Sequence, residues 1–199
     1  MWTHLRSCVW DGPTCLRRTP CLKDYYSQLQ NFFCGILDLG EADINTLVRE
    51  ASQLTAHDNL AHVTEVLIAV NNFLDKPTTN SRESTVRQDA LQHLRQCRIF
   101  PVNDKRPSPD FDYLESVSSR PIWYIADRPH LRHSFERLLP LLAVKTEYIE
   151  KISTLLEQLG VQSRTLSRVA TGVSESQGKL ELLKGYSNSL RSKARYIAR

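Results

Sequence analysis

The sequence predicts a mainly α-helical fold with an irregular N-terminal arm, a helical bundle, a small two-stranded β element near the centre and a C-terminal amphipathic helix. Most of the chain repeats apolar residues at intervals of three and four, the spacing that gathers them on one face of a helix. Two short runs, 99–102 and 122–126, instead combine β-branched and aromatic residues between turn formers, which is typical of strands. We therefore expect these two runs to pair with each other at the centre of the fold.

Composition and periodicity divide the chain into three segments. Residues 1–21 contain two Trp, three Cys and two Pro without regular periodicity, which predicts an irregular arm anchored by Trp2 and Trp10. Residues 22–97 predict a helical lobe, and residues 98–199 predict the β element with further helices. The three segments are compatible with one domain overall, because 199 residues that are 41% hydrophobic can bury a single core.

Predicted helices lie on both sides of the β element. Their expected ranges are 22–39, 41–55, 59–74, 80–97, 129–138, 146–159, a short helix after Ser163, and 179–198. Asp58 and Asn80 are the expected N-terminal caps of the helices that follow them. Gly40 and Gly160 are expected to end the helices that precede them. In the first helix, the apolar spacing predicts that Phe33 is buried in the core.

Catalytic, cofactor and metal sites have no support in the sequence. The three cysteines of the arm, with His4, lack the closely spaced cysteine pair that structural zinc sites use. No G-x-S-x-G motif presents a nucleophile, and the seven glycines are too far apart for a phosphate-binding loop. The sequence therefore predicts a chain that is not an enzyme, with no catalytic residue, no cofactor and no metal ligand.

Cysteine usage and hydropathy bear on the cellular compartment. Five cysteines at irregular spacing make a poor disulfide framework, which favours reduced thiols in the cytoplasm or nucleus. The first residues contain no apolar run typical of a signal peptide, and no window approaches the length that a membrane span needs. We expect a cytoplasmic or nuclear chain without a membrane partner.

The formal net charge of +4 is concentrated at the C-terminal end. Residues 179–199 carry six basic residues against Glu181, a net charge of +5, so the remaining chain is close to −1. This segment is the candidate for an acidic or nucleic-acid partner, although a solvated helix face is the simpler interpretation. A nucleic-acid-associated helical module is therefore the alternative function.

The same C-terminal segment is the candidate interaction surface. Its apolar residues follow a spacing of three and four that places them in one stripe, and its basic residues lie off that stripe. The stripe consists of Leu183, Tyr186, Leu190, Ala194 and Ile197, and the basic residues beside it are Arg191, Lys193, Arg195 and Arg199. Either the stripe binds a protein partner or a second copy, or the helix packs as the last member of the bundle.

Four stretches, in a fixed order, carry a family resemblance. They read CVWDGPTCLRRTPCLKDYY from Cys8, LRQCRIFPV from Leu94, WYIADRPHLRHSF from Trp123 and SLRSKARYIAR from Ser189. A further short match spans 159–168. Together these stretches resemble the region downstream of the ATPase module in large fungal sacsin-like proteins, and the resemblance covers most of residues 8–199.

The sacsin-like family carries a histidine-kinase-like (GHKL-type) ATPase module, and this chain lacks its motifs. Neither the asparagine-bearing helix nor the glycine loop of that module has a counterpart here, so no nucleotide-binding residue is carried over. The resemblance implies a truncated or stand-alone segment of a longer chaperone-like protein. It favours a non-catalytic interaction or scaffold role with a protein partner or through self-association.

Overall fold

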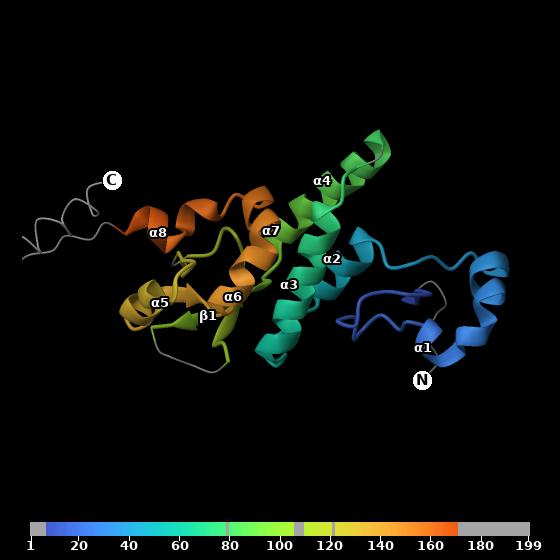
Figure 1. Cartoon of the computed structure of the whole chain (residues 1–199), viewed down its shortest axis with the longest axis horizontal. Helices are drawn as coiled ribbons and strands as arrows, with labels where there is room; N and C mark the ends of the chain where they lie inside the picture. The colour runs from blue at the N-terminus through green and yellow to red at the C-terminus, as the bar shows by residue number, and fades with distance from the viewer. Residues whose placement is uncertain (1–6, 79, 106–109, 121, 171–199) are drawn as a thin grey trace, which may run out of the picture.

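The chain is mainly helical with one small sheet, so the predicted mainly α fold is confirmed; the sheet lies in the half of the molecule away from the N-terminal segment (Figure 1). The computed structural model describes residues 7–78, 80–105, 110–120 and 122–170. The helix predicted over 179–198 lies outside these residues, as does Trp2. None of the described helices combines the length and the apolar character that crossing a membrane requires.

The helices are short except for two of sixteen residues. Those before the sheet are α1 (Lys23–Tyr26), η2 (Ser27–Leu29), η3 (Asn31–Ile36), α2 (Ile44–Ser52), α3 (Leu60–Asp75) and α4 (Ser81–Gln96). Those interleaved with the sheet or following it are α5 (Pro129–Phe135), α6 (Thr146–Ile149), η4 (Glu150–Ile152), α7 (Ser153–Gln158), η5 (Gln162–Arg164) and α8 (Leu166–Val169). The elements η2, η4 and η5 are 3-10 helices, and η3 is a π-helix.

The sheet has three antiparallel strands in the order β2-β1-β3, not the predicted two. The strands are β1 (Phe100–Asp104), β2 (Tyr113–Glu115) and β3 (Pro140–Leu142). Val102 of β1 lies opposite Tyr113 on one side and Leu142 on the other.

The predicted pairing of 99–102 with 122–126 is wrong. The first run does form most of a strand, but β2 and β3 occupy both of its edges. The second run is left outside the sheet, where Tyr124 forms a single bridge with Leu141 and Ile125 forms one with Thr165. Its apolar composition reflects burial, since Ile125 is almost fully enclosed.

Trp123 connects three separate parts of the chain in the core. Its side chain is fully buried, and its ring centroid lies 4.7 Å from that of Phe100 in β1. The Arg164 guanidinium lies 4.8 Å from the same ring centroid, within range of a cation–π interaction. The indole Nε1 donates a 3.1 Å hydrogen bond to the backbone oxygen of Ser116. Trp123 therefore holds the sheet, the turn after β2 and the segment before α8 together.

Side chains cap the three longest helices at their N-termini. The Asn80 side chain accepts a 2.8 Å hydrogen bond from the amide of Glu83, which confirms the predicted cap of α4. The predicted cap at Asp58 is wrong by one residue, because Asn59 accepts the equivalent bond from the amide of His62. Each cap satisfies an amide that lacks a partner within the helix.

The single helix predicted over 22–39 is replaced by α1, η2 and η3, and none of their residues is buried. Phe33, predicted as a core residue, is only half-buried, and its ring stacks on Trp10 of the arm at 5.9 Å. The apolar residues of this segment do recur at helical spacing. Among the described residues, however, it is the small arm that packs against them. Asp38, in the left-handed conformation at φ 52°, follows this segment, so Gly40 is not the residue that turns the chain there.

The N-terminal arm, residues 7–22, folds back on itself and is joined to the chain after η3. Val9 bridges Cys21, and the amide of Trp10 donates to the backbone oxygen of Gly40 at 2.8 Å. Gly12 lies where the arm comes close to the chain that follows η3. A larger residue would not fit there, because a Cβ at position 12 would lie 2.9 Å from the Cβ of Ala42. The arm and residues 23–43 therefore form one attached unit at an end of the molecule (Figure 1).

The position of Trp123 predicts a large loss of stability on truncation. Trp123→Ala should lower the free energy of unfolding by roughly 3–5 kcal/mol, because it removes a fully buried ring together with its contacts to Phe100 and Arg164. Ile122→Ala is the matched control: Ile122 is the adjacent residue but half of its side chain is exposed, so its loss should stay within about 0.5 kcal/mol. Chemical denaturation of both variants measures the difference, and equal losses would contradict the role given to Trp123.

Candidate functional site

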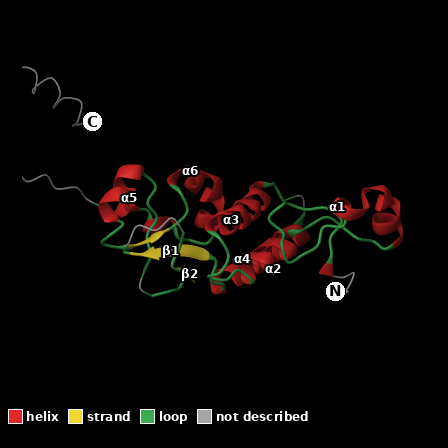
Figure 2. Ribbon diagram, turned by 90° about the horizontal axis from the view of Figure 1, so that it is seen from below, coloured by secondary structure: helices red, strands yellow, loops and turns green. Residues whose placement is uncertain are grey.

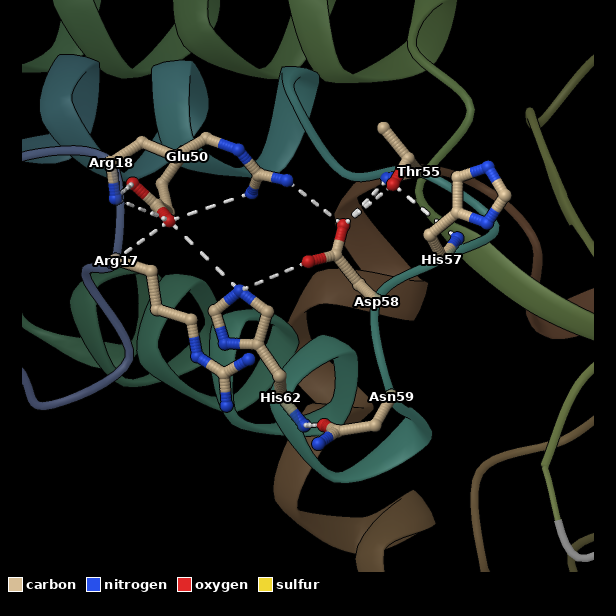
Figure 3. Close-up of polar contacts among 8 residues, drawn as sticks. All are labelled: Arg17, Arg18, Glu50, Thr55, His57, Asp58, Asn59 and His62. Carbon is tan, nitrogen blue, oxygen red and sulfur yellow. Dashed lines mark hydrogen bonds and ion pairs between the residues drawn. The ribbon is translucent and has the colours of Figure 1, made fainter.

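A buried carboxylate, Glu50 of α2, is the centre of a polar cluster between the arm and the bundle (Figure 3). Its side chain is fully enclosed. One carboxylate oxygen accepts the Arg17 amide at 3.0 Å, and both oxygens accept the Arg18 amide at 3.2 Å. The Arg18 guanidinium lies 3.7 Å away. Glu50 thus compensates the burial of its charge by binding two backbone amides of the arm.

Asp58 forms the second half of this cluster. It accepts a 2.9 Å hydrogen bond from the Arg18 guanidinium and a 2.8 Å bond from the amide of Thr55. Partial burial acts to raise the pKa of Asp58, but these two hydrogen bonds, a third from the Thr55 hydroxyl and the charge of Arg18 together outweigh it and lower that pKa below its ordinary value. The Arg18 guanidinium therefore lies between the carboxyl groups of Glu50 and Asp58 and contacts both.

His62 of α3 faces both carboxylates without a hydrogen bond to either (Figure 3). Its Nε2 lies 3.9 Å from Glu50 and 4.0 Å from Asp58, and its side chain is fully buried. Burial lowers the pKa of His62, the charge of Arg17 adds to this, and the two carboxylates oppose it. The imidazole is therefore neutral near pH 7.

A cysteine also lies near the Glu50 carboxylate of this cluster. Cys15 of the arm is buried, and burial together with the charge of Glu50 raises the pKa of its thiol to about 11. A nucleophilic cysteine needs the opposite shift, since the thiolate is the reactive form. Within residues 7–170, excepting the gaps already given, no group of three or more His, Cys, Asp or Glu could hold a metal ion. The arrangement instead attaches the arm to the bundle.

A surface depression of about 360 Å³ lies between the arm and α3. Most of its lining is apolar, and Glu65 and Lys76 are its charged members. Its lining residues are Pro13, Thr14, Cys15, Ala42, Leu47, Glu65, Ile68, Ala69, Asn72, Phe73 and Lys76. Thr14 and Asn72 are its uncharged polar members, so four of its lining residues are polar.

Exposed apolar side chains form the second notable feature, which we call the aromatic surface. Its members are Tyr25 (76% exposed), Tyr26 (50%), Leu29 (47%), Phe32 (45%) and Ile36 (73%). Tyr26 and Phe32 each contact the half-buried Phe33, with ring centroids 5.6 and 5.3 Å apart, so the aromatic rings are held against one another. Five large apolar side chains within twelve residues form a patch of the kind that marks interaction sites.

The charge around the aromatic surface is acidic. Residues 22–43 contain Lys23 and four carboxylates, a net charge of −3. Lys23 forms an ion pair with Asp11 of the arm, while Asp24, Asp38 and Glu41 are exposed. A partner of this surface is therefore expected to be apolar and basic.

The candidate interaction residues that the sequence predicted, from Leu183 to Arg199, lie outside the described residues. The buried cluster was missed, although a signal existed. Glu50 lies three residues after Leu47 and four before Leu54, so it falls within the apolar stripe of its helix. A charged residue in such a stripe indicates a buried partner.

A family profile described as a domain of unknown function, DUF8348, matches residues 45–170. This is more than half of the chain. The chain belongs to the DUF8348 family. No curated protein and no solved structure matches it.

The limits of the DUF8348 domain divide the two features just described. Glu50, Asp58 and His62 lie inside the matched region. The arm and the aromatic surface precede it. The DUF8348 domain therefore supplies the carboxylates that bind the arm. The exposed apolar side chains belong to the segment that follows the arm and precedes the domain.

The neutral state of buried His62 predicts a pH dependence of stability. Because its pKa is lower in the folded chain than in the unfolded chain, its contribution is fully present above the unfolded value of about 6.5 and is lost as the pH falls through the folded value. Between pH 7.5 and 5.5, His62→Gln should flatten the pH dependence of the free energy of unfolding. His57→Gln, at an exposed histidine of the loop that precedes α3, is the matched control and should leave it unchanged.

Proposed function

We propose that the chain is a non-catalytic protein-interaction module in which the DUF8348 domain is the scaffold and the aromatic surface binds the partner. The observation that carries this proposal is the exposure of Tyr25 and Ile36 to about three quarters of their surface. Large apolar side chains at helical spacing normally pack into a core. Among the described residues they are held in place through Phe33 and Trp10 and are otherwise exposed, which supports a binding role for their outer side.

The attachment of the aromatic surface supports the same proposal. The arm is fixed to the DUF8348 domain through buried Glu50, and the segment with the exposed rings is fixed to the arm through the Trp10–Phe33 contact. A surface whose rings are already ordered loses less conformational entropy when it binds. The polar cluster therefore serves the interaction by positioning the surface.

The acidic flank favours a basic protein segment over a nucleic acid. Asp24, Asp38 and Glu41 would repel phosphate groups, although the exposed rings could otherwise stack on bases. The partner we propose is a basic amphipathic helix, whose apolar face covers the aromatic surface and whose charges meet these carboxylates.

We also propose a sacsin-like context for this module. Its first support is the order of the four stretches that resemble the sacsin-like proteins. Its second support is the structural role of residues in the third stretch, which begins at Trp123. Trp123 is fully buried, and Arg132 donates hydrogen bonds to the backbone oxygens of Leu142 and Val144. Residues of this kind define a fold and not a catalytic centre, in keeping with a scaffold segment downstream of an ATPase.

A pair of designed peptides tests the proposed function. A 20-residue amphipathic helix of leucine and lysine should bind the full chain with a dissociation constant on the order of 10 μM by fluorescence anisotropy. The matched peptide with glutamate in place of lysine should bind at least about tenfold more weakly. Ile36→Glu, which places a charge at the most exposed aliphatic residue of the surface, should weaken binding of the lysine peptide. Equal binding of both peptides, or no binding of either, contradicts the proposal.

A further inference from the structure

The DUF8348 chain contains a segment whose sequence matches the partner just proposed. Residues 179–199 have a net charge of +5 and an apolar stripe from Leu183 to Ile197. The aromatic surface has a net charge of −3 in its segment and runs from Tyr25 to Ile36. The stripe spans fifteen residues of the sequence and the surface twelve, so the two are similar in length.

The aromatic surface and the end of the described chain lie at opposite ends of the molecule. Figures 1 and 2 both show α1 at one end of the long axis and α5 at the other. Leu166, the first residue of α8, packs beside Leu131 and Phe135 of α5, so the described chain ends far from the aromatic surface.

The reach of the chain decides which copy supplies the segment. Twelve residues, 171–182, lie between the last described residue and Leu183, the first residue of the apolar stripe, and fully extended they span roughly 40 Å. A compact chain of this size is about 40 Å across, and this one is elongated. Within one chain, binding at the aromatic surface would need this linker to be almost fully extended along the molecule, whereas the basic segment of a second copy needs no such extension.

We propose that the aromatic surface of one copy binds residues 179–199 of a second copy, so that DUF8348 chains associate head to tail. This inference rests on the proposed function, because it uses the same surface and names its occupant. The apolar stripe of the segment covers Tyr25, Phe32 and Ile36, and its arginines face Asp24 and Glu41. The two bound patches differ, so the contact is heterologous and produces rings or open chains rather than a closed symmetric dimer.

Sedimentation of the full chain over a range of concentrations tests this inference. The average mass should rise with concentration, and Ile36→Glu should weaken the association by roughly tenfold or more. Ile122→Glu introduces the same change at an exposed isoleucine elsewhere and should behave as the unmodified chain. Circular dichroism confirms that both variants keep the fold. A mass of one chain at all concentrations, or association that survives Ile36→Glu, overturns the inference.

Charge reversal identifies the two patches directly. Asp24→Lys with Glu41→Lys makes the surface basic, and Arg191→Glu with Arg195→Glu makes the segment acidic. Each double variant alone should remain a monomer, and mixing the two should restore association. If mixing restores nothing, the two patches do not meet. If the chain is monomeric while the designed lysine peptide still binds, this inference fails and the proposed function stands; if neither associates, both fail.

Discussion

Burial of Trp123 between Phe100 and Arg164 is the contact on which the DUF8348 fold depends. The strands are only three to five residues long, and such a sheet has little stability of its own. Trp123 links the central strand to the turn after β2 and to the segment before α8, which are far apart in the sequence. One buried ring thereby joins the sheet to the C-terminal helices, and α3 packs against η4 and α7.

The arm is attached to this scaffold through a buried carboxylate as well as through apolar contacts of Cys15 and Leu16. Glu50 is buried inside the DUF8348 domain and binds amides of Arg17 and Arg18, which lie more than thirty residues earlier. Removing a buried carboxylate from water is unfavourable unless its oxygens are bound, so this carboxylate favours the docked arm. The docked arm in turn positions Trp10, on which Phe33 and the aromatic surface rest.

Sequence periodicity predicted most helices but could not identify what each apolar face contacts. The stripes of α2 and α3 meet the core, whereas an equally regular stripe over 22–39 meets only Trp10 and is largely exposed. Strands β2 and β3 are too short to show an alternating pattern, so the partners of β1 were missed. The cluster around Glu50 depends on contacts between residues distant in sequence, and only the misplaced charge within an apolar stripe pointed to it.

The central claim is that residues 22–39 present a binding surface and are not part of the core. Hydrogen exchange measured by mass spectrometry tests it most directly, because exchange reports the local stability of each segment. At low protein concentration, amides of 22–39 should exchange much faster than those of α3 and β1, and they should slow as the concentration rises while α3 and β1 stay unchanged. Protection of 22–39 equal to that of α3 at every concentration would contradict the account.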